Sequence, residues 1–242
     1  MKKIIKTIPS FITSMNLLCG TIATIMAING EIRIATILIL LAAVFDFFDG
    51  FVARLLKATS EFGVQMDSLA DLISFGFAPT ALLYNLIINN CEIYKYFAFI
   101  SVLIVIFSAL RLAKFNTDSE QSIEFKGLPT PASALFIISI CEYCSTNDNN
   151  LSNFLANEIV ISIIIISISA LMVSNIRLMS LKIKNFSISK YIYQIVLVIS
   201  AIGLIILFRF LGIGITIILY ILFSIIRNYI LKSNKNEIHS RN

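Results

Sequence analysis

The chain has 242 residues, of which 58% are hydrophobic and only 14% are charged, and its formal net charge is +5. Its mean hydropathy of +0.90 excludes a soluble globular domain. Its basic residues are not interleaved with aromatic ones as they are in nucleic-acid grooves, so we expect no nucleic acid as a partner.

Apolar stretches long enough to cross a bilayer recur along the whole chain. We therefore predict an all-α, polytopic membrane helix bundle with about eight transmembrane helices. The predicted spans are residues 10–29, 32–53, 65–88, 96–113, 131–144, 157–174, 191–208 and 211–228. The fifth is short for a crossing. The last two are split only around Arg209, so residues 191–228 are either two spans or one broken span.

The basic residues indicate how the bundle is oriented. With the N-terminus in the cytoplasm, every Lys and Arg lies on the cytoplasmic side except Arg33, Lys95 and Arg209. Such an excess is what the positive-inside rule describes. We predict an integral protein of the cell (inner) membrane, surrounded by membrane lipids, with both termini and the active site on the cytoplasmic side.

Four aspartates stand where the second and third spans meet. Asp46 and Asp49 are spaced i,i+3, and Asp67 and Asp71 are spaced i,i+4, so each pair lies on one face of its helix. Acids within a membrane are costly and indicate function. Both pairs fall at the predicted cytoplasmic end of antiparallel neighbours. Carboxylate oxygens favour Mg²⁺ or Mn²⁺, so we predict a metal site of these four residues holding two ions.

The aspartates belong to a longer spaced pattern that includes Gly50, Ala53, Arg54 and Gly63. Written out, it is D-x2-D-G-x2-A-R-x8-G-x3-D-x3-D. The pattern resembles, with no departure, the signature of the CDP-alcohol phosphatidyltransferases. The resemblance implies that an alcohol hydroxyl displaces CMP from a CDP-linked lipid, normally CDP-diacylglycerol.

The same resemblance implies a domain organisation and an oligomeric state. Residues 1–182 would form the catalytic membrane domain with a six-helix core. Residues 183–242 would add two further transmembrane helices and a polar tail. Members of the family are generally dimeric, so we expect a homodimer.

Roles for individual residues also follow from the resemblance. Asp46, Asp49 and Asp67 would bind metal, and Asp71 would face the metals and accept the acceptor's proton. The residues expected at the CDP-linked lipid are Asn16, Gly50, Ala53, Arg54 and Gly63. For Asn16 an interhelical hydrogen bond explains the residue equally well. Whether Asp71 acts mainly as a base or as a metal ligand stays open.

Three further segments, residues 67–79, 111–132 and 171–182, resemble the bacterial and archaeal phosphatidylserine synthases of this family. They predict L-serine as the acceptor. The candidates for binding serine lie in the predicted loop after the fourth span; they are Arg111, Lys114, Asn116 and Lys126. The subgroup usually has Arg at position 114 and a Tyr-Pro-Ser type sequence where this chain has Leu-Met-Ser after Arg177.

Two alternatives remain. A sister enzyme would use glycerol 3-phosphate, inositol phosphate or choline, but the two phosphorylated acceptors should require additional cations. A metal-ion transporter would place acids at mid-membrane along a path, whereas these acids cluster on one side.

Overall fold

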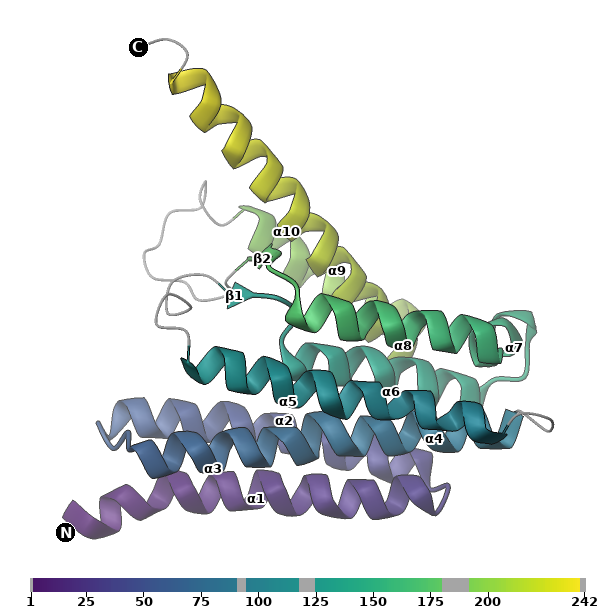
Figure 1. The fold of residues 1–242 in the computed structure, drawn as a ribbon, viewed down its shortest axis with the longest axis horizontal. Helices are drawn as coiled ribbons and strands as arrows, with labels where there is room; N and C mark the ends of the chain where they lie inside the picture. The colour runs from purple at the N-terminus through teal and green to yellow at the C-terminus, as the bar shows by residue number, and fades with distance from the viewer. Residues whose placement is uncertain (1, 91–94, 118–124, 180–191, 240–242) are drawn as a thin grey trace.

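The fold is described from a computed structural model, which defines residues 2–90, 95–117, 125–179 and 192–239. Helices account for nearly all of this part of the chain, and most of them run side by side (Figure 1). The α-helices are α1 (Lys2–Ile28), α2 (Ile32–Leu55), α3 (Glu61–Asp71), α4 (Ala78–Asn90), α5 (Val102–Thr117), α6 (Thr130–Thr146), α7 (Asn150–Ala156), α8 (Glu158–Val173), α9 (Ile192–Phe208) and α10 (Phe210–His239). A π-helical segment (Leu72–Phe77), a 3₁₀-helix (Lys95–Ser101) and two short strands, β1 (Phe125–Lys126) and β2 (Arg177–Leu178), complete the elements.

Several helices have the length and apolar composition of membrane spans. Five qualify separately: Thr7–Ile28, Ile32–Leu55, Glu61–Asn90, Tyr96–Thr117 and Phe210–Asn228. The pair α7 and α8, bent by 61°, makes a sixth if it forms one broken span. The predicted all-α polytopic bundle is therefore confirmed. Both α6 and α9 have 17 residues, at the lower limit for a crossing, so the count of eight spans stays a prediction.

Small side chains bring α1 and α2 together. Ala23 and Ala27 on α1, and Ala35 and Ala42 on α2, are completely buried. Small residues let helix backbones approach closely, which is the packing mode that membrane helices use in the absence of a hydrophobic driving force. On its outer side α2 exposes large apolar residues such as Phe47, which suit contact with lipid.

The predicted third span contains a feature that periodicity did not indicate. Helices α3 and α4 are continuous through the π-helical segment Leu72–Phe77, which follows directly after Asp71. One extra residue per turn shifts the face that the helix presents, and such segments occur frequently at functional sites. At the other end of α3, the Ser60 side chain caps the helix by accepting a hydrogen bond from the Gly63 N–H at 3.1 Å.

One prediction about the chain after the fourth span needs correction. Helix α5 continues to Thr117, so Arg111, Lys114 and Asn116 are helical and do not lie in a loop. Beyond it, β1 pairs antiparallel with β2, and the Gly127 N–H donates a hydrogen bond to the Ile176 carbonyl oxygen. Gly127 has φ +78, and a Cβ there would lie 2.3 Å from the Met172 carbonyl oxygen.

The last two predicted spans are separate helices. The chain turns at Arg209, which has φ 51, and α10 packs against α9 and α6. A Cβ on Gly212 would lie 2.2 Å from the Leu204 carbonyl oxygen, so the two helices fold back closely on each other. Whether both helices cross the membrane stays a prediction. The predicted domain boundary at 182 lies outside the described residues.

Candidate active site

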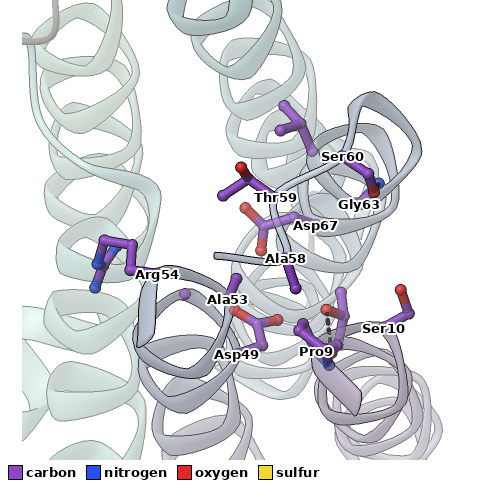
Figure 2. Close-up of a pocket in the computed structure, with 13 residues that line it drawn as sticks. Pro9, Ser10, Asp49, Ala53, Arg54, Ala58, Thr59, Ser60, Gly63 and Asp67 are labelled. Carbon is purple, nitrogen blue, oxygen red and sulfur yellow. Dashed lines mark hydrogen bonds between the residues drawn. The ribbon is translucent and has the colours of Figure 1, made fainter. Parts of the chain in front are cut away.

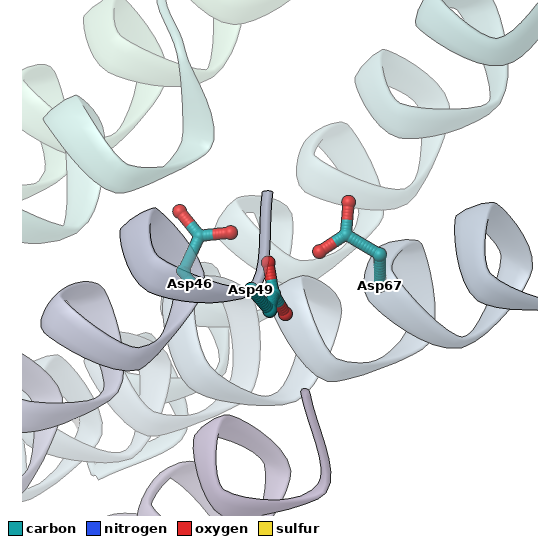
Figure 3. A group of neighbouring side chains, drawn as sticks. All are labelled: Asp46, Asp49 and Asp67. Carbon is teal, nitrogen blue, oxygen red and sulfur yellow. The ribbon is translucent and has the colours of Figure 1, made fainter. Parts of the chain in front are cut away.

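Three of the four aspartates form a compact cluster. Asp46 and Asp49 lie on the last turns of α2, and Asp67 lies on α3, with all three carboxylates directed into the same space (Figure 3). One oxygen from each lies within 4.8 Å of the others. The short link between the antiparallel helices thus brings residues from both predicted pairs together.

The cluster has the properties of a site for a divalent cation. Asp49 is buried, and both its Oδ2 and the Oδ1 of Asp67 are inaccessible to solvent without a hydrogen-bond partner among the described residues. Desolvated oxygens of like charge repel unless a cation or a proton compensates them. Three convergent carboxylates therefore fit a hard divalent ion.

Asp71 lies beside this cluster, one turn further along the same helix. Its charged neighbours are the carboxylates of Asp46 and Asp67 and the guanidinium of Arg111. Its Oδ1 accepts a hydrogen bond of 3.5 Å from the Asn16 side chain on α1. The fourth aspartate is buried, and its carboxylate lies beside the Arg111 guanidinium and the Asn16 side-chain amide.

Asn16 is completely buried and connects two helices. In addition to its contact with Asp71, its backbone carbonyl accepts a hydrogen bond of 3.0 Å from the Ser74 hydroxyl. Asn16 does not line the pocket next to Asp49. The interhelical hydrogen bond, one of the two interpretations of Asn16 from the sequence, is thus present.

A pocket of about 160 Å³ adjoins the aspartate cluster (Figure 2). Asp49 and Asp67 form part of its wall, and all of Gly50, Ala53, Arg54 and Gly63 line it as well. The other lining residues come from α1, from the link between α2 and α3, and from the start of α3; they are Pro9, Ser10, Thr13, Ala58, Thr59, Ser60 and Val64. Sequence reasoning missed these, and only Ser60, an N-cap type residue before a helix, carried a detectable signal.

Arg111 is one of the candidate serine-binding residues that the structure brings to the site. It is buried on α5, next to Asp71, and donates a hydrogen bond of 3.1 Å from Nη1 to the Thr130 hydroxyl on α6. Its Nε has no partner among the described residues. A buried guanidinium with an unsatisfied donor is suited to bind an anionic group.

The other candidates have different surroundings. Lys114 donates hydrogen bonds to the Asn175 side chain at 2.9 Å and to the Val173 carbonyl at 3.4 Å, so its ammonium ties α5 to the end of α8. The Asn116 side chain donates a hydrogen bond of 2.8 Å to the hydroxyl of Ser68, which is the residue directly after Asp67. Lys126 lies in β1, where its backbone pairs with β2.

Comparison with known proteins gives consistent similarities. The chain is 33% identical over 160 residues to the CDP-diacylglycerol–serine O-phosphatidyltransferase of Methanocaldococcus jannaschii, covering 66% of this chain and 69% of that protein. It is 36% identical over 132 residues to the enzyme of the same name from Helicobacter pylori, covering 54% and 55%. It is 37% identical over 135 residues to the archaetidylserine synthase of Methanothermobacter thermautotrophicus, covering 54% and 56%.

The chain therefore matches little more than half of the length of two of these relatives. A family model described as CDP-alcohol phosphatidyltransferase matches residues 6–168, which include the whole aspartate cluster, the adjoining pocket and Arg111. This chain belongs to the CDP-alcohol phosphatidyltransferase family.

Proposed function

We propose that this protein transfers a phosphatidyl group from CDP-diacylglycerol to the hydroxyl of L-serine, giving phosphatidylserine and CMP. The observation that carries the proposal is the position of the Arg111 guanidinium beside Asp71, next to the cluster of the other three aspartates. Such an arrangement offers a cation for the carboxylate of an amino acid and a carboxylate for the proton of its hydroxyl. The names of the relatives support serine as the acceptor.

The pocket beside Asp49 is suited to the CDP part of the donor. Gly50 and Gly63 have no side chain, so a phosphate or nucleotide can approach the backbone there. Ala53 adds only a methyl group, and Arg54 brings a planar cation to the wall. Together these residues would hold the pyrophosphate against the aspartates while the diacylglycerol stays among the apolar helix surfaces.

Asp46, Asp49 and Asp67 would hold Mg²⁺ or Mn²⁺, with two ions in the complete site. The bound ions would offset negative charge on the pyrophosphate and on the departing CMP. The burial of Asp49 would strengthen this binding, because the electrostatic attraction between a carboxylate and a cation is stronger away from bulk water.

Asp71 would take the proton from serine. The serine oxygen forms a bond to the phosphorus that carries diacylglycerol, the bond from that phosphorus to the CMP oxygen breaks, and CMP leaves with the electron pair. The hydrogen bond from Asn16 orients the Asp71 carboxylate, and Arg111 would bind the serine carboxylate through its Nε. No side chain needs to form a phosphatidyl-enzyme intermediate in this direct attack.

The remaining candidates would act at the edge of the serine site. Asn116 contacts Ser68, adjacent to Asp67, and so would fix the end of α5 against α3. Lys114 already binds Asn175, which favours a positioning role over contact with serine. Lys126 would contribute positive charge at the edge of the proposed serine site.

An acceptor screen tests the proposal. Purified protein, CDP-diacylglycerol and Mg²⁺ or Mn²⁺ would be incubated with L-serine, glycerol 3-phosphate, inositol phosphate or choline, and CMP release would be measured. We expect release with serine alone. CMP release only with another acceptor would contradict serine as the acceptor and indicate a sister enzyme of the family. If no acceptor caused CMP release and the protein instead carried metal ions into vesicles, the transporter alternative would be favoured.

The five long apolar helices fit an integral membrane protein. We propose that it resides in the cell membrane with the aspartates and both termini on the cytoplasmic side, and that it acts as a homodimer. Impermeant thiol labelling of Lys57→Cys and Asn147→Cys in a cysteine-free background tests the orientation. Labelling of Lys57→Cys from outside intact cells would contradict it.

A further inference from the structure

A second cavity, of about 590 Å³, lies at the end of the bundle opposite to the aspartates. Its wall includes Arg33 at the start of α2, Glu142 near the end of α6 and Arg209 at the turn between α9 and α10. Asp49 lies sixteen positions after Arg33 on α2, which corresponds to about 24 Å along the helix. The cavity therefore does not belong to the site described above.

The two arginines are exceptional in the charge pattern of the chain. Arg33, Lys95 and Arg209 are the basic residues that the predicted topology leaves on the non-cytoplasmic side. Two of these three line one cavity, although they are far apart in sequence. Arg209 also adopts φ 51, a left-handed conformation that is least costly for glycine.

Glu142 is the complementary charge. Only 1% of the residue is exposed, and its Oε2 has no hydrogen-bond partner in the described part of the chain. Arg33 is a charged neighbour and the Thr36 side chain on α2 a polar one, but no ion pair joins Glu142 to Arg33 or Arg209 within the described residues. A buried carboxylate that has a polar neighbour but no ion pair is costly unless a cation binds it.

We propose that this cavity binds the headgroup of an aminophospholipid. The two guanidinium groups would bind the phosphate and, in phosphatidylserine, would share the serine carboxylate, while the Glu142 carboxylate would bind the ammonium group. Apolar residues on the same wall, among them Leu207 and Phe208, would contact the glycerol and the first acyl carbons. The volume lies within the range of ligand pockets. Two cations and one anion also match a headgroup with phosphate, carboxylate and ammonium, which favours phosphatidylserine over phosphatidylethanolamine.

The binding proposal does not rest on the transfer reaction, and it can be tested without it. Native mass spectrometry of the purified protein would give the affinity for dihexanoyl phosphatidylserine, phosphatidylethanolamine and phosphatidylglycerol. We expect binding in this order. Arg209→Gln and Arg33→Gln should each weaken binding of all three lipids about tenfold, since each removes a charge-assisted bond to phosphate.

Glu142→Gln provides the selective signature. It should weaken binding of the two amino lipids and leave phosphatidylglycerol unchanged, because only the former carry ammonium. Arg227→Gln, which removes the same charge from α10 outside the cavity, is the matched control and should behave as wild type. If the variants match this control, or if wild type does not distinguish amino lipids from phosphatidylglycerol, the proposal is overturned.

Two further measurements cover misfolding and the source of the ligand. If a glutamine variant does not fold, a photoreactive phosphatidylserine can be crosslinked to wild type. Adducts at Tyr143 or Leu207–Leu211 support the site, and adducts confined to other segments contradict it. Soluble glycerophosphoserine should bind much more weakly than the lipid, and equal binding would overturn the assignment to a lipid.

Discussion

Gly20 and Ser74 lie so close that a Cβ atom on Gly20 would sit 2.1 Å from the Ser74 Oγ and 2.6 Å from the Ser74 Cα. This approach joins α1 to the π-helical segment and lets Asn16, one turn earlier on α1, reach Asp71. A glycine on one helix and a π turn on the other therefore cooperate to position the side chain of the proposed base.

Gly20→Ala should both destabilise the protein and impair catalysis. The added methyl group cannot be accommodated without moving the backbone of one helix, and overpacking of this kind costs about 1–3 kcal/mol. We expect a lower unfolding temperature and a lower kcat. Gly203→Ala is the matched control, because a Cβ at that glycine has no atom within 4 Å. Equal stability and turnover in the two variants would contradict the close approach.

Asp67→Asn should reduce transfer at least about a hundredfold, because it removes one charged ligand from a cluster in which each carboxylate contributes to holding the cation. The measurement is CMP release at saturating CDP-diacylglycerol and serine. Glu61→Gln changes the same charge on an exposed position of the same helix and should retain activity. Near wild-type turnover of Asp67→Asn at matched expression would refute a metal site here.

Asp71→Asn separates a base from a metal ligand. Asparagine keeps the size and one oxygen but has no useful basicity, and general-base catalysis is typically worth about 10²–10⁴-fold. We expect kcat to fall within this range while the metal concentration for half activity changes little. A large rise in that concentration, with the rate restored by excess Mn²⁺, would instead identify Asp71 as mainly a ligand.

Arg111→Lys should raise the KM for serine about tenfold and change the KM for CDP-diacylglycerol much less. Lysine keeps the charge but loses the planar donor set that would bind the serine carboxylate. Lys114→Gln serves for comparison, since the Lys114 ammonium is engaged by Asn175 and should contribute little to serine affinity. If Lys114→Gln raised the KM for serine more than Arg111→Lys did, the serine site would instead lie near Lys114 and the end of α8.

Local patterns in the sequence were sufficient for much of the molecule. Hydropathy over about twenty residues predicted the membrane helices, because burial in lipid requires only that each helix be apolar along its length. The i,i+3 and i,i+4 spacings placed each aspartate pair on one helix face, and the short link between α2 and α3 made the two pairs neighbours. The spaced signature also predicted the wall of the pocket at Gly50, Ala53, Arg54 and Gly63.

Only the tertiary structure decided which distant residues meet. The positions of Asn16 and Arg111 beside Asp71 depend on how α1 and α5 pack around the π-helical segment, which the hydrophobic periodicity of the sequence did not predict. The cavity with Arg33, Glu142 and Arg209 requires three helix ends to converge. Such contacts arise from side-chain shape and helix crossing across long separations in the chain, whereas the hydrophobic pattern specifies only what each helix does along its own axis.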